Sequence, residues 1–261
     1  MLRSRIIPCL LVHNKGLVKT VEFKDPKYVG DPINAVKIFN EKEVDELIVL
    51  DIDASVEGRG PNFELIKNLA VECRMPFCYG GGVTNVDQAK EIISLGAEKV
   101  ALSTSAIKNP ELITKIGKAV GVQSVVVVID VKKRKGFFSS SGYDIYIKNG
   151  KEKVEIELDD LISKFNALGV GEILINSIDQ DGKMSGYDMN LVDKVRNSTD
   201  VPMTVLGGAG NLEHIENLIS KYKIIGAAAG SLFVFRGKYK AVLINYPDPK
   251  TKLELTKINK V

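Results

Sequence analysis

The feature that most constrains this chain is an internal repeat of two glycine runs. One run, Gly80-Gly81-Gly82, follows a short apolar stretch, and a second, Gly207-Gly208, follows another. Each is followed by a helical pattern and then by a strand of small residues, which ends at Ser103-Thr104 or at Gly230-Ser231. Gly81 to Gly208 and Thr104 to Ser231 are both steps of 127 residues. Constant spacing of this kind predicts a chain built from two similar halves.

Strands alternate with amphipathic helical patterns along the whole chain, which indicates βα units and a parallel sheet. Eight units in 261 residues fit a single closed (β/α)8 TIM barrel with an internal two-fold half-barrel repeat. A doubly wound sheet is the alternative, but it does not predict two halves of four units each. We expect residues 1–245 to form the barrel and residues 246–261 a C-terminal surface tail. The expected strands are 5–12, 46–53, 76–81, 99–103, 124–130, 172–178, 202–206 and 224–229.

Two connections are longer than the others and both follow strands, so both belong to the C-terminal face of the barrel, where active sites lie. The first covers residues 12–27 and is basic. The second covers residues 131–157 and includes 136–143, rich in Gly, Phe and Ser, and Asn149-Gly150, a hairpin turn signal.

Composition excludes several classes of function. The net charge of +3 is too small to indicate nucleic acid or membrane surfaces as partners. No apolar run is long enough to span a membrane and the N-terminus lacks a secretory pattern, so we expect a cytoplasmic protein. Three cysteines and two histidines without ligand spacing predict no metal site, and nothing indicates a cofactor.

The glycine runs predict two anion sites, because glycines at strand ends leave backbone amides uncovered by side chains. The first site combines Gly82 with Ser103 and Thr104. The second combines Gly208 with Gly230 and Ser231, helped by Asp181 and Gly182. Two such sites on opposite sides of one barrel mouth favour a ligand with a phosphate at each end. The alternative is that these glycines only allow helices to pack closely on the sheet.

Acid–base chemistry on such a ligand needs ionisable groups at the ends of opposing strands. Asp130 follows a buried apolar strand and is the candidate, although an aspartate at a strand end can also be a structural cap. The matching position in the other half is Leu11, which cannot transfer a proton. The mouth also offers carboxylates that bind ligand or fix loops, namely Asp51, Asp53, Asp179 and Asp181.

Four charged residues begin strands and therefore point to the opposite, N-terminal end of the barrel. They are Arg5, Glu46, Lys99 and Glu172. Two cations and two carboxylates could close an ion-pair ring there. Spacing alone favours scattered surface ion pairs, which contribute only about 0–1 kcal/mol each.

Taken together, these motifs resemble the cyclase subunit of imidazole glycerol phosphate synthase, the HisF family. The resemblance covers nearly the whole chain and rests on residues 5–10, 30–32, 45–55, 80–82, 124–130, 171–182 and 207–210. It implies a (β/α)8 barrel with a HisH-like glutaminase subunit docked at its N-terminal face, ammonia passing through the barrel, and a bis-phosphorylated substrate at the top.

The resemblance also implies roles for single residues. Asp130 matches one of two catalytic aspartates, and Lys19 matches a basic residue of the loop that closes over substrate. Phosphate contacts are implied for Gly82, Thr104, Gly182, Gly208 and Ser231. The resemblance also implies that four charged residues form the gate at the ammonia entrance, and it therefore favours the ion-pair ring over the scattered surface pairs that spacing alone favours. They are Arg5, Glu46, Lys99 and Glu172.

The chain departs from the family at the second aspartate, where Leu11 stands, and also at Ser103, Asn176 and Leu206. Loss of an acid–base partner costs about 10²–10⁴-fold in rate. The pattern resembles a divergent HisF branch, the glycosyl-amidation subunit WbuZ. That resemblance implies an ammonia-conducting barrel that serves a sugar amidotransferase in surface-polysaccharide biosynthesis, which is the preferred interpretation.

Two alternatives stay open. One is an ordinary cyclase of histidine biosynthesis that recruits Asp51 or Asp53 in place of the missing aspartate. The other is a non-catalytic scaffold that binds a bis-phosphate and switches on a partner glutaminase.

Overall fold

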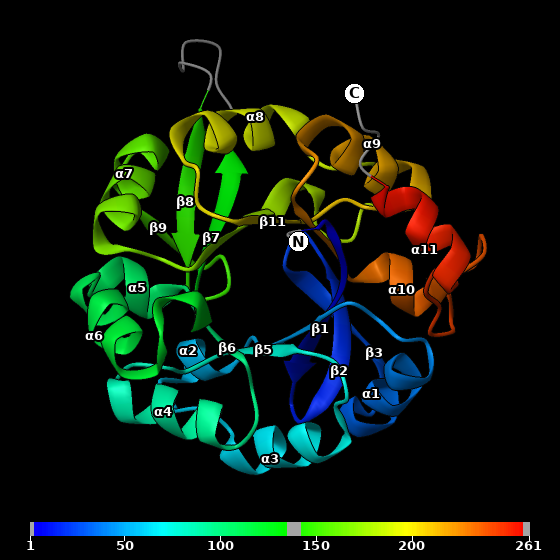
Figure 1. Cartoon of the computed structure of the whole chain (residues 1–261), viewed down its shortest axis with the longest axis horizontal. Helices are drawn as coiled ribbons and strands as arrows, with labels where there is room; N and C mark the ends of the chain where they lie inside the picture. The colour runs from blue at the N-terminus through cyan, green and yellow to red at the C-terminus, as the bar shows by residue number, and fades with distance from the viewer. Residues whose placement is uncertain (1–2, 135–141, 258–261) are drawn as a thin grey trace.

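A computed structural model describes residues 3–134 and 142–257 as a barrel of parallel strands enclosed by helices (Figure 1). The eight predicted strands are confirmed within the described residues, with ends shifted by up to three residues. They are β1 (Arg5–His13), β4 (Leu47–Asp51), β5 (Phe77–Gly80), β6 (Lys99–Leu102), β7 (Val125–Lys133), β10 (Glu172–Ser177), β11 (Met203–Leu206) and β12 (Gly226–Ala229).

The strands pair in the order β10-β11-β12-β1-β4-β5-β6-β7, and pairing of β7 with β10 closes the barrel. Every neighbouring pair in this order is parallel, with Asn176 beside Asp130 and Leu11 beside Leu50 in the registers. β1 and β7 therefore lie on opposite sides of the barrel. The predicted (β/α)8 architecture is confirmed.

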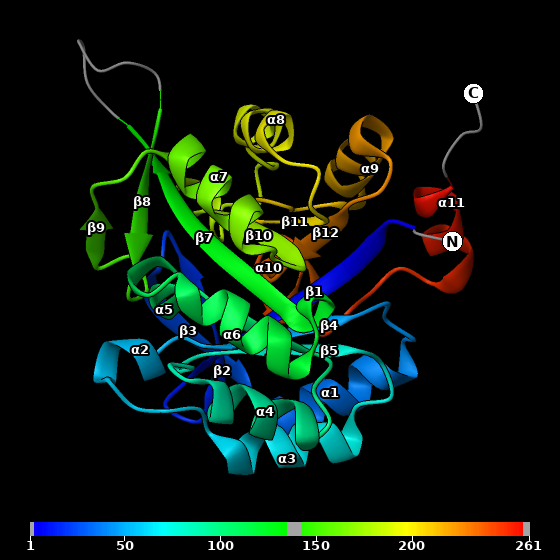
Figure 2. The same cartoon turned by 60° about the vertical axis from the view of Figure 1, so that its left-hand side comes forward.

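Helices cover the outside of the sheet (Figures 1 and 2). Side chains of Asp31, Asn62, Asn85, Asp188 and Asn211 cap five of them by accepting a backbone N–H in the first turn. None in the described part of the chain is long and apolar enough to cross a membrane. The helices are α1 (Pro32–Glu41), α2 (Ala54–Glu57), α3 (Phe63–Glu72), α4 (Val86–Ser94), α5 (Thr104–Lys108), α6 (Glu111–Val120), α7 (Leu158–Leu168), α8 (Met189–Ser198), α9 (Leu212–Tyr222), α10 (Ser231–Val234) and α11 (Pro249–Thr256).

The two long connections form hairpins that extend barrel strands, which the strand patterns did not predict. β2 (Gly16–Val21) folds back on β1 and pairs with β3 (Lys24–Gly30), while β8 (Tyr143–Ile147) folds back on β7 and pairs with β9 (Glu152–Val154). The predicted turn at Asn149-Gly150 joins β8 to β9, and both residues have positive φ. Most of the predicted 136–143 segment lies outside the described residues.

Two apolar layers result from the alternation of side chains along the strands. The larger layer lies between the sheet and the helices. The smaller fills the barrel interior and consists of Ile7, Cys9, Ile48, Cys78, Ala101, Val126, Val128, Leu174, Leu206 and Ala228, with Leu11 and Leu50 packed against it. The interior is therefore packed between the charged base and the mouth.

The repeat is present, but the step between the glycine runs is 126 residues, so the predicted step of 127 is wrong by one. Gly81 and Gly207 occupy equivalent positive-φ positions, and Asn85 and Asn211 cap the helices that follow. The step becomes 127 at Ser103 and Gly230, which precede α5 and α10. The one extra residue lies between these points, where α9 with 11 residues is longer than α4 with 9.

The C-terminal segment crosses to the base of the barrel and ends beside the N-terminal strand (Figure 2). After α10, β13 (Phe235–Arg236) and β14 (Ala241–Val242) form a small hairpin that is exposed apart from the buried Phe235. Tyr246 donates its hydroxyl to the Ile6 carbonyl at 2.8 Å, and Lys252 pairs with Asp45 at 3.1 Å. α11 has no buried residue.

Candidate functional site

A cavity of about 550 Å³ opens at the carboxyl ends of the barrel strands. The structure brings the sequence-predicted phosphate-binding residues and the catalytic candidate together in its lining, with Asp51, whereas Asp53 and Asp179 do not line it. The phosphate-binding residues and the catalytic candidate are Lys19, Gly82, Ser103, Thr104, Asp130, Asp181, Gly182, Gly208, Gly230 and Ser231. Leu11 lines the same cavity.

The first glycine loop follows β5 and requires glycine on geometric grounds. Gly81 and Gly82 have φ of 130° and 73°, in the left-handed region that other residues rarely adopt. A Cβ on Gly82 would lie 2.5 Å from the Arg59 carbonyl oxygen. The chain therefore presents bare backbone to the cavity here, beside Thr104, whose hydroxyl accepts from the Lys148 amide at 3.1 Å.

The second glycine loop follows β11 on the opposite side of the mouth. Gly207 and Gly208 have φ of 93° and 114°, and a Cβ on Gly208 would overlap the carbonyl oxygen of Gly186. At the end of the next strand, a Cβ on Gly230 would lie 2.6 Å from Nζ of Lys19. This side of the cavity therefore combines bare backbone with a cation.

Lys19 is an unusual cation because its side chain is buried. It reaches from β2 into the mouth, where Nζ donates to the Cys9 carbonyl at 2.5 Å. Burial lowers the pKa of Lys19, and the nearby charge of Asp181 opposes that shift. An anion arriving at this ammonium would return part of the electrostatic stabilisation that burial removed.

Asp130 lies within β7, where the strand reaches the mouth, and is buried in the cavity wall. Its Oδ1 accepts a hydrogen bond of 2.9 Å from Nδ2 of Asn176 on the neighbouring strand β10. Burial raises its pKa to about 6, against the hydrogen bond from Asn176, which lowers it. A carboxyl group with a pKa near 6 exchanges protons at neutral pH, as a general acid or base must.

Two buried polar atoms beside Asp130 lack a well-formed hydrogen bond among the described residues. They are Oγ of Ser103, which directly follows β6, and Oδ1 of Asn176. β6, β7 and β10 are successive strands of the barrel, so these atoms flank the carboxyl group on both sides.

Leu11 lies at the mouth, as the sequence predicts, on the strand opposite Asp130. It lines the cavity with Leu50 and Leu206, which gives that wall an apolar character. Asp130 therefore has no ionisable counterpart at the Leu11 position.

The other carboxylates of the mouth are engaged in fixing loops. Asp51 receives both terminal nitrogens of Arg59, at 2.7 and 2.9 Å, and the amides of Asp53 and Ala54. Asp53 accepts from Nδ1 of His13 at 2.7 Å. With their oxygens so occupied, Asp51 and Asp53 are poor substitutes for a missing acid–base group.

Asp181 and Asp179 also hold hairpins. Asp181 accepts from the Thr20 hydroxyl at 2.6 Å and from the Phe23 amide at 3.1 Å, which ties down the tip between β2 and β3. Asp179 accepts from the Lys133 amide at 2.6 Å. The carboxylate of Asp181, predicted to assist a phosphate site, is thus directed at the chain itself.

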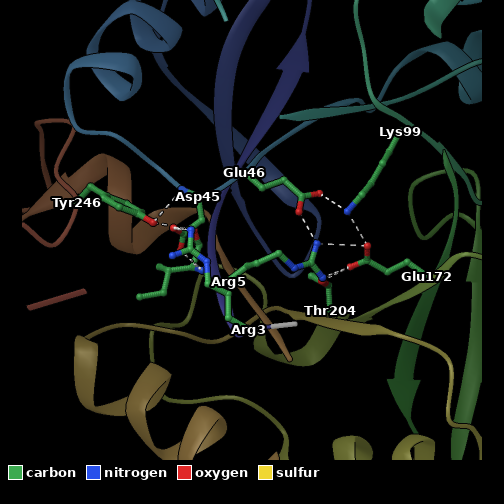
Figure 3. A network of polar contacts seen from close by, with 9 residues as sticks. Arg3, Arg5, Asp45, Glu46, Lys99, Glu172, Thr204 and Tyr246 are labelled. Carbon is green, nitrogen blue, oxygen red and sulfur yellow. Dashed lines mark hydrogen bonds and ion pairs between the residues drawn. The ribbon is translucent and has the colours of Figure 1, made fainter. Parts of the chain in front are cut away.

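At the other end of the barrel, the four charged residues meet in one alternating network (Figure 3). Arg5 contacts Glu46 and donates to Glu172 at 2.8 Å, while Lys99 contacts Glu46 at 2.7 Å and Glu172 at 2.8 Å. Thr204 donates a further hydrogen bond to Glu172. The expectation of scattered pairs from spacing alone is wrong, because inward-pointing side chains at strand starts converge inside a closed barrel.

Burial and pairing act in opposite directions on these groups. For Glu172, burial favours the neutral form, but the charges of Arg5 and Lys99 outweigh it and lower the pKa. For Lys99, burial again disfavours the charge, and Glu172 and Glu46 raise the pKa. Glu172 and Lys99 are therefore ionised near neutral pH.

Sequence reasoning missed two contributors to the mouth. Arg59 fixes Asp51, and its position between Gly58 and Gly60 is the signal of a tight loop that could have drawn attention to it. Phe23 lines the cavity from the β2–β3 tip and packs against Gly150 of the other hairpin, a contact that no local pattern indicates.

Comparison with known proteins agrees with this geometry. The sequence model of the histidine biosynthesis protein family matches residues 5–240. A protein of Vibrio vulnificus named "Putative imidazole glycerol phosphate synthase subunit hisF3" is 55% identical over 97% of this chain and 96% of its own length. A Leptospira borgpetersenii protein named "Putative imidazole glycerol phosphate synthase subunit HisF" is 54% identical over 97% and 98%. "Imidazole glycerol phosphate synthase subunit HisF" of Natranaerobius thermophilus is 38% identical over 96% and 98%.

Proposed function

The chain belongs to the histidine biosynthesis protein family as a HisF-type barrel, and from that premise we propose that it is the ammonia-using subunit of an imidazole glycerol phosphate synthase complex. In this proposal a glutaminase subunit binds the base of the barrel, and a bis-phosphorylated substrate binds the mouth. The complex works in the cytoplasm.

The observation that carries the proposal is the convergence of the mouth residues on one cavity. Two glycine loops face each other across it, with Lys19 beside the second and Asp130 between them in the wall. Bare backbone at strand ends and a buried ammonium suit phosphate groups. A carboxyl group with a pKa of about 6 suits the proton transfers of ring closure.

The charged network at the base supports an ammonia entrance. Arg5, Glu46, Lys99 and Glu172 close the N-terminal end of the barrel interior. A network that shares each carboxylate between two cations can lose one contact while keeping the others. We propose that a docked glutaminase uses this property to admit ammonia.

Leu11 favours a second candidate function, delivery of ammonia to a separate sugar amidotransferase. Cyclisation needs more than one proton transfer, and the mouth offers Asp130 while Asp51 and Asp53 are held by other groups. In this second proposal the barrel keeps its base and its phosphate loops, and the acceptor sugar reacts elsewhere.

One experiment separates the two. The chain is purified with its glutaminase and supplied with the bis-phosphorylated ribulosyl substrate, and formation of imidazole glycerol phosphate is followed with glutamine and with ammonium salt. Turnover by the unchanged protein supports the cyclase. No detectable turnover by the unchanged protein, together with turnover by Leu11→Asp at least 10-fold above the detection limit, supports ammonia delivery.

Leu11→Ile is the matched control, because it keeps the wall apolar and should leave turnover unchanged. If the substrate neither binds the chain nor stimulates the glutaminase, both proposals are wrong.

A further inference from the structure

Just after each glycine loop, a backbone amide donates to a side chain four residues further along, in the first turn of the following helix. In the first half, the Thr84 amide donates to Oε1 of Gln88 at 2.8 Å. In the second half, the Gly210 amide donates to Nδ1 of His214 at 3.1 Å. The two pairs occupy equivalent places in the repeat, 126 residues apart.

The imidazole of His214 must act here as an acceptor. A backbone amide can only donate, so Nδ1 carries no proton and the ring proton resides on Nε2. On its other side the ring packs against the turn at Gly186, where an added Cβ would lie 3.7 Å from Nε2. His214 therefore contacts both the glycine loop and the turn that supports it.

The second loop has little freedom to adjust if this support is lost. The Gly186 amide donates to the Gly208 carbonyl at 2.8 Å, and a Cβ on Gly210 would overlap the Met184 carbonyl. Loop and turn are thus in backbone contact along their length. Removing the acceptor leaves the Gly210 amide without its partner, and the loop must move to satisfy it.

We propose that His214 is a positioning residue for phosphate at the second glycine loop, acting through the Gly210 amide, and that Gln88 does the same at the first. The inference rests on the proposed function, since it assumes that the loops bind phosphate. It adds that each site has its own support, so the two sites can be weakened one at a time.

The test follows the backbone amide resonances of the purified full chain during titration with inorganic phosphate. His214→Ala should weaken phosphate binding at Gly207 and Gly208 by about 2–10-fold, the worth of one hydrogen bond, and leave the response at Gly81 and Gly82 unchanged. His214→Gln, which supplies the acceptor used by the first half, should restore binding to within about twofold. Gln88→Ala should give the mirror-image pattern.

Several outcomes would overturn the inference. Unchanged phosphate affinity at Gly207 and Gly208 in His214→Ala would do so, as would imidazole nitrogen shifts that place the proton of His214 on Nδ1. If His214→Ala does not fold, Gln88→Ala decides through the first loop alone. No response of either loop in the unchanged protein would refute phosphate binding itself. If both loops respond and none of the substitutions changes the response, only the positioning role is refuted.

Discussion

At the scale of single residues, Asp130 shows how a barrel wall sets the chemistry of a carboxyl group. Its pKa is raised to about 6 from an ordinary value of 3.8, chiefly because the side chain is buried. The unfolded chain ionises between these two pH values while the folded chain does not. Folding is therefore less favourable above pH 6 than below pH 3.8.

We expect Asp130→Asn to stabilise the protein at pH 8 by about 1–3 kcal/mol, because it removes the cost of the buried charge while Asn176 still finds an acceptor. The gain should shrink as the pH falls through 6 and vanish near pH 4. Urea denaturation at several pH values measures it. A gain that persists undiminished at pH 4 would contradict the pKa argument.

The charge of Lys19 lowers the stability of the fold but serves the proposed function. Its folded pKa is lowered, chiefly by burial, so the charged form costs stability at neutral pH, and this cost disappears only above the ordinary value of 10.5. We expect Lys19→Met to raise the free energy of unfolding by about 1 kcal/mol and to weaken phosphate binding about 10-fold or more.

Thermal denaturation and phosphate titration measure the two effects. Lys15→Met, an exposed cation on the same hairpin, is the matched control and should change neither. A loss of both stability and binding in Lys19→Met would show that Lys19 serves the fold and not the ligand.

The sequence predicted much of this site, because strand ends were recognisable and their side chains converge in any closed barrel. The positions of Asp130, Leu11 and the glycines could be predicted from the register of their strands alone. The loops could not be predicted in the same way. The engagement of Asp51 by Arg59, and of Asp181 by Thr20 and Phe23, depends on contacts between segments far apart in the chain.

At the scale of elements, the base network joins the starts of β1, β6 and β10 and the residue before β4. Glu172 has a lowered pKa because Arg5 and Lys99 outweigh its burial, so its contribution to stability is complete above the ordinary value of 4.5 and is lost as the pH falls through the folded value. Lys99 has a raised pKa, so its contribution is complete below 10.5 and is lost above that value.

We expect Glu172→Gln to destabilise the protein by about 2–4 kcal/mol at pH 7, because it leaves Arg5 and Lys99 sharing one carboxylate in a buried site. Lys194→Met, which breaks an exposed pair with Asp159, should cost less than about 1 kcal/mol. Chemical denaturation compares them, and the penalty of Glu172→Gln should shrink in acid. Equal penalties for the two variants would mean that the base network behaves as a surface pair.

Strand and helix positions were predictable because apolar periodicity was strong in each βα unit. The hairpins β2–β3 and β8–β9 were not. β3 is exposed from Lys24 to Tyr28 and gives no burial pattern, while β2 and β8 do carry buried side chains but nothing in their pattern shows that they fold back on β1 and β7.

At the scale of the whole molecule, the C-terminal segment holds the first and second barrel strands together at their starts. The β1–β4 ladder begins only at Cys9 and Ile48. Below it, Tyr246 donates to the Ile6 carbonyl at 2.8 Å and accepts from the Asp45 amide at 3.3 Å (Figure 3). One hydroxyl group thus links the two chain segments at Ile6 and Asp45, the neighbours in sequence of Arg5 and Glu46.

We expect Tyr246→Phe to lower the free energy of unfolding by about 1–2 kcal/mol, because a carbonyl and an amide lose their shared partner. Tyr239→Phe, at a side chain that is 90% exposed, should change it by less than about 0.5 kcal/mol. Hydrogen exchange at the Asp45 amide, which donates to the Tyr246 hydroxyl, should speed up in the first variant alone. No change at this amide would show that the segment does not hold the two strands together.

The near two-fold symmetry of the mouth has a consequence for orientation. Under the proposed function, a molecule with similar anionic groups at both ends meets bare backbone at Gly81-Gly82 and at Gly207-Gly208 in either orientation, and Lys19 adds a cation beside the second loop. Leu11 and Asp130 occupy opposite walls and make the two orientations different. In one orientation the reacting centre of the ligand lies beside a carboxyl group that can exchange a proton, and in the other it lies beside a hydrocarbon side chain. A leucine on one wall and a carboxyl group on the other therefore favour one orientation of the bound molecule.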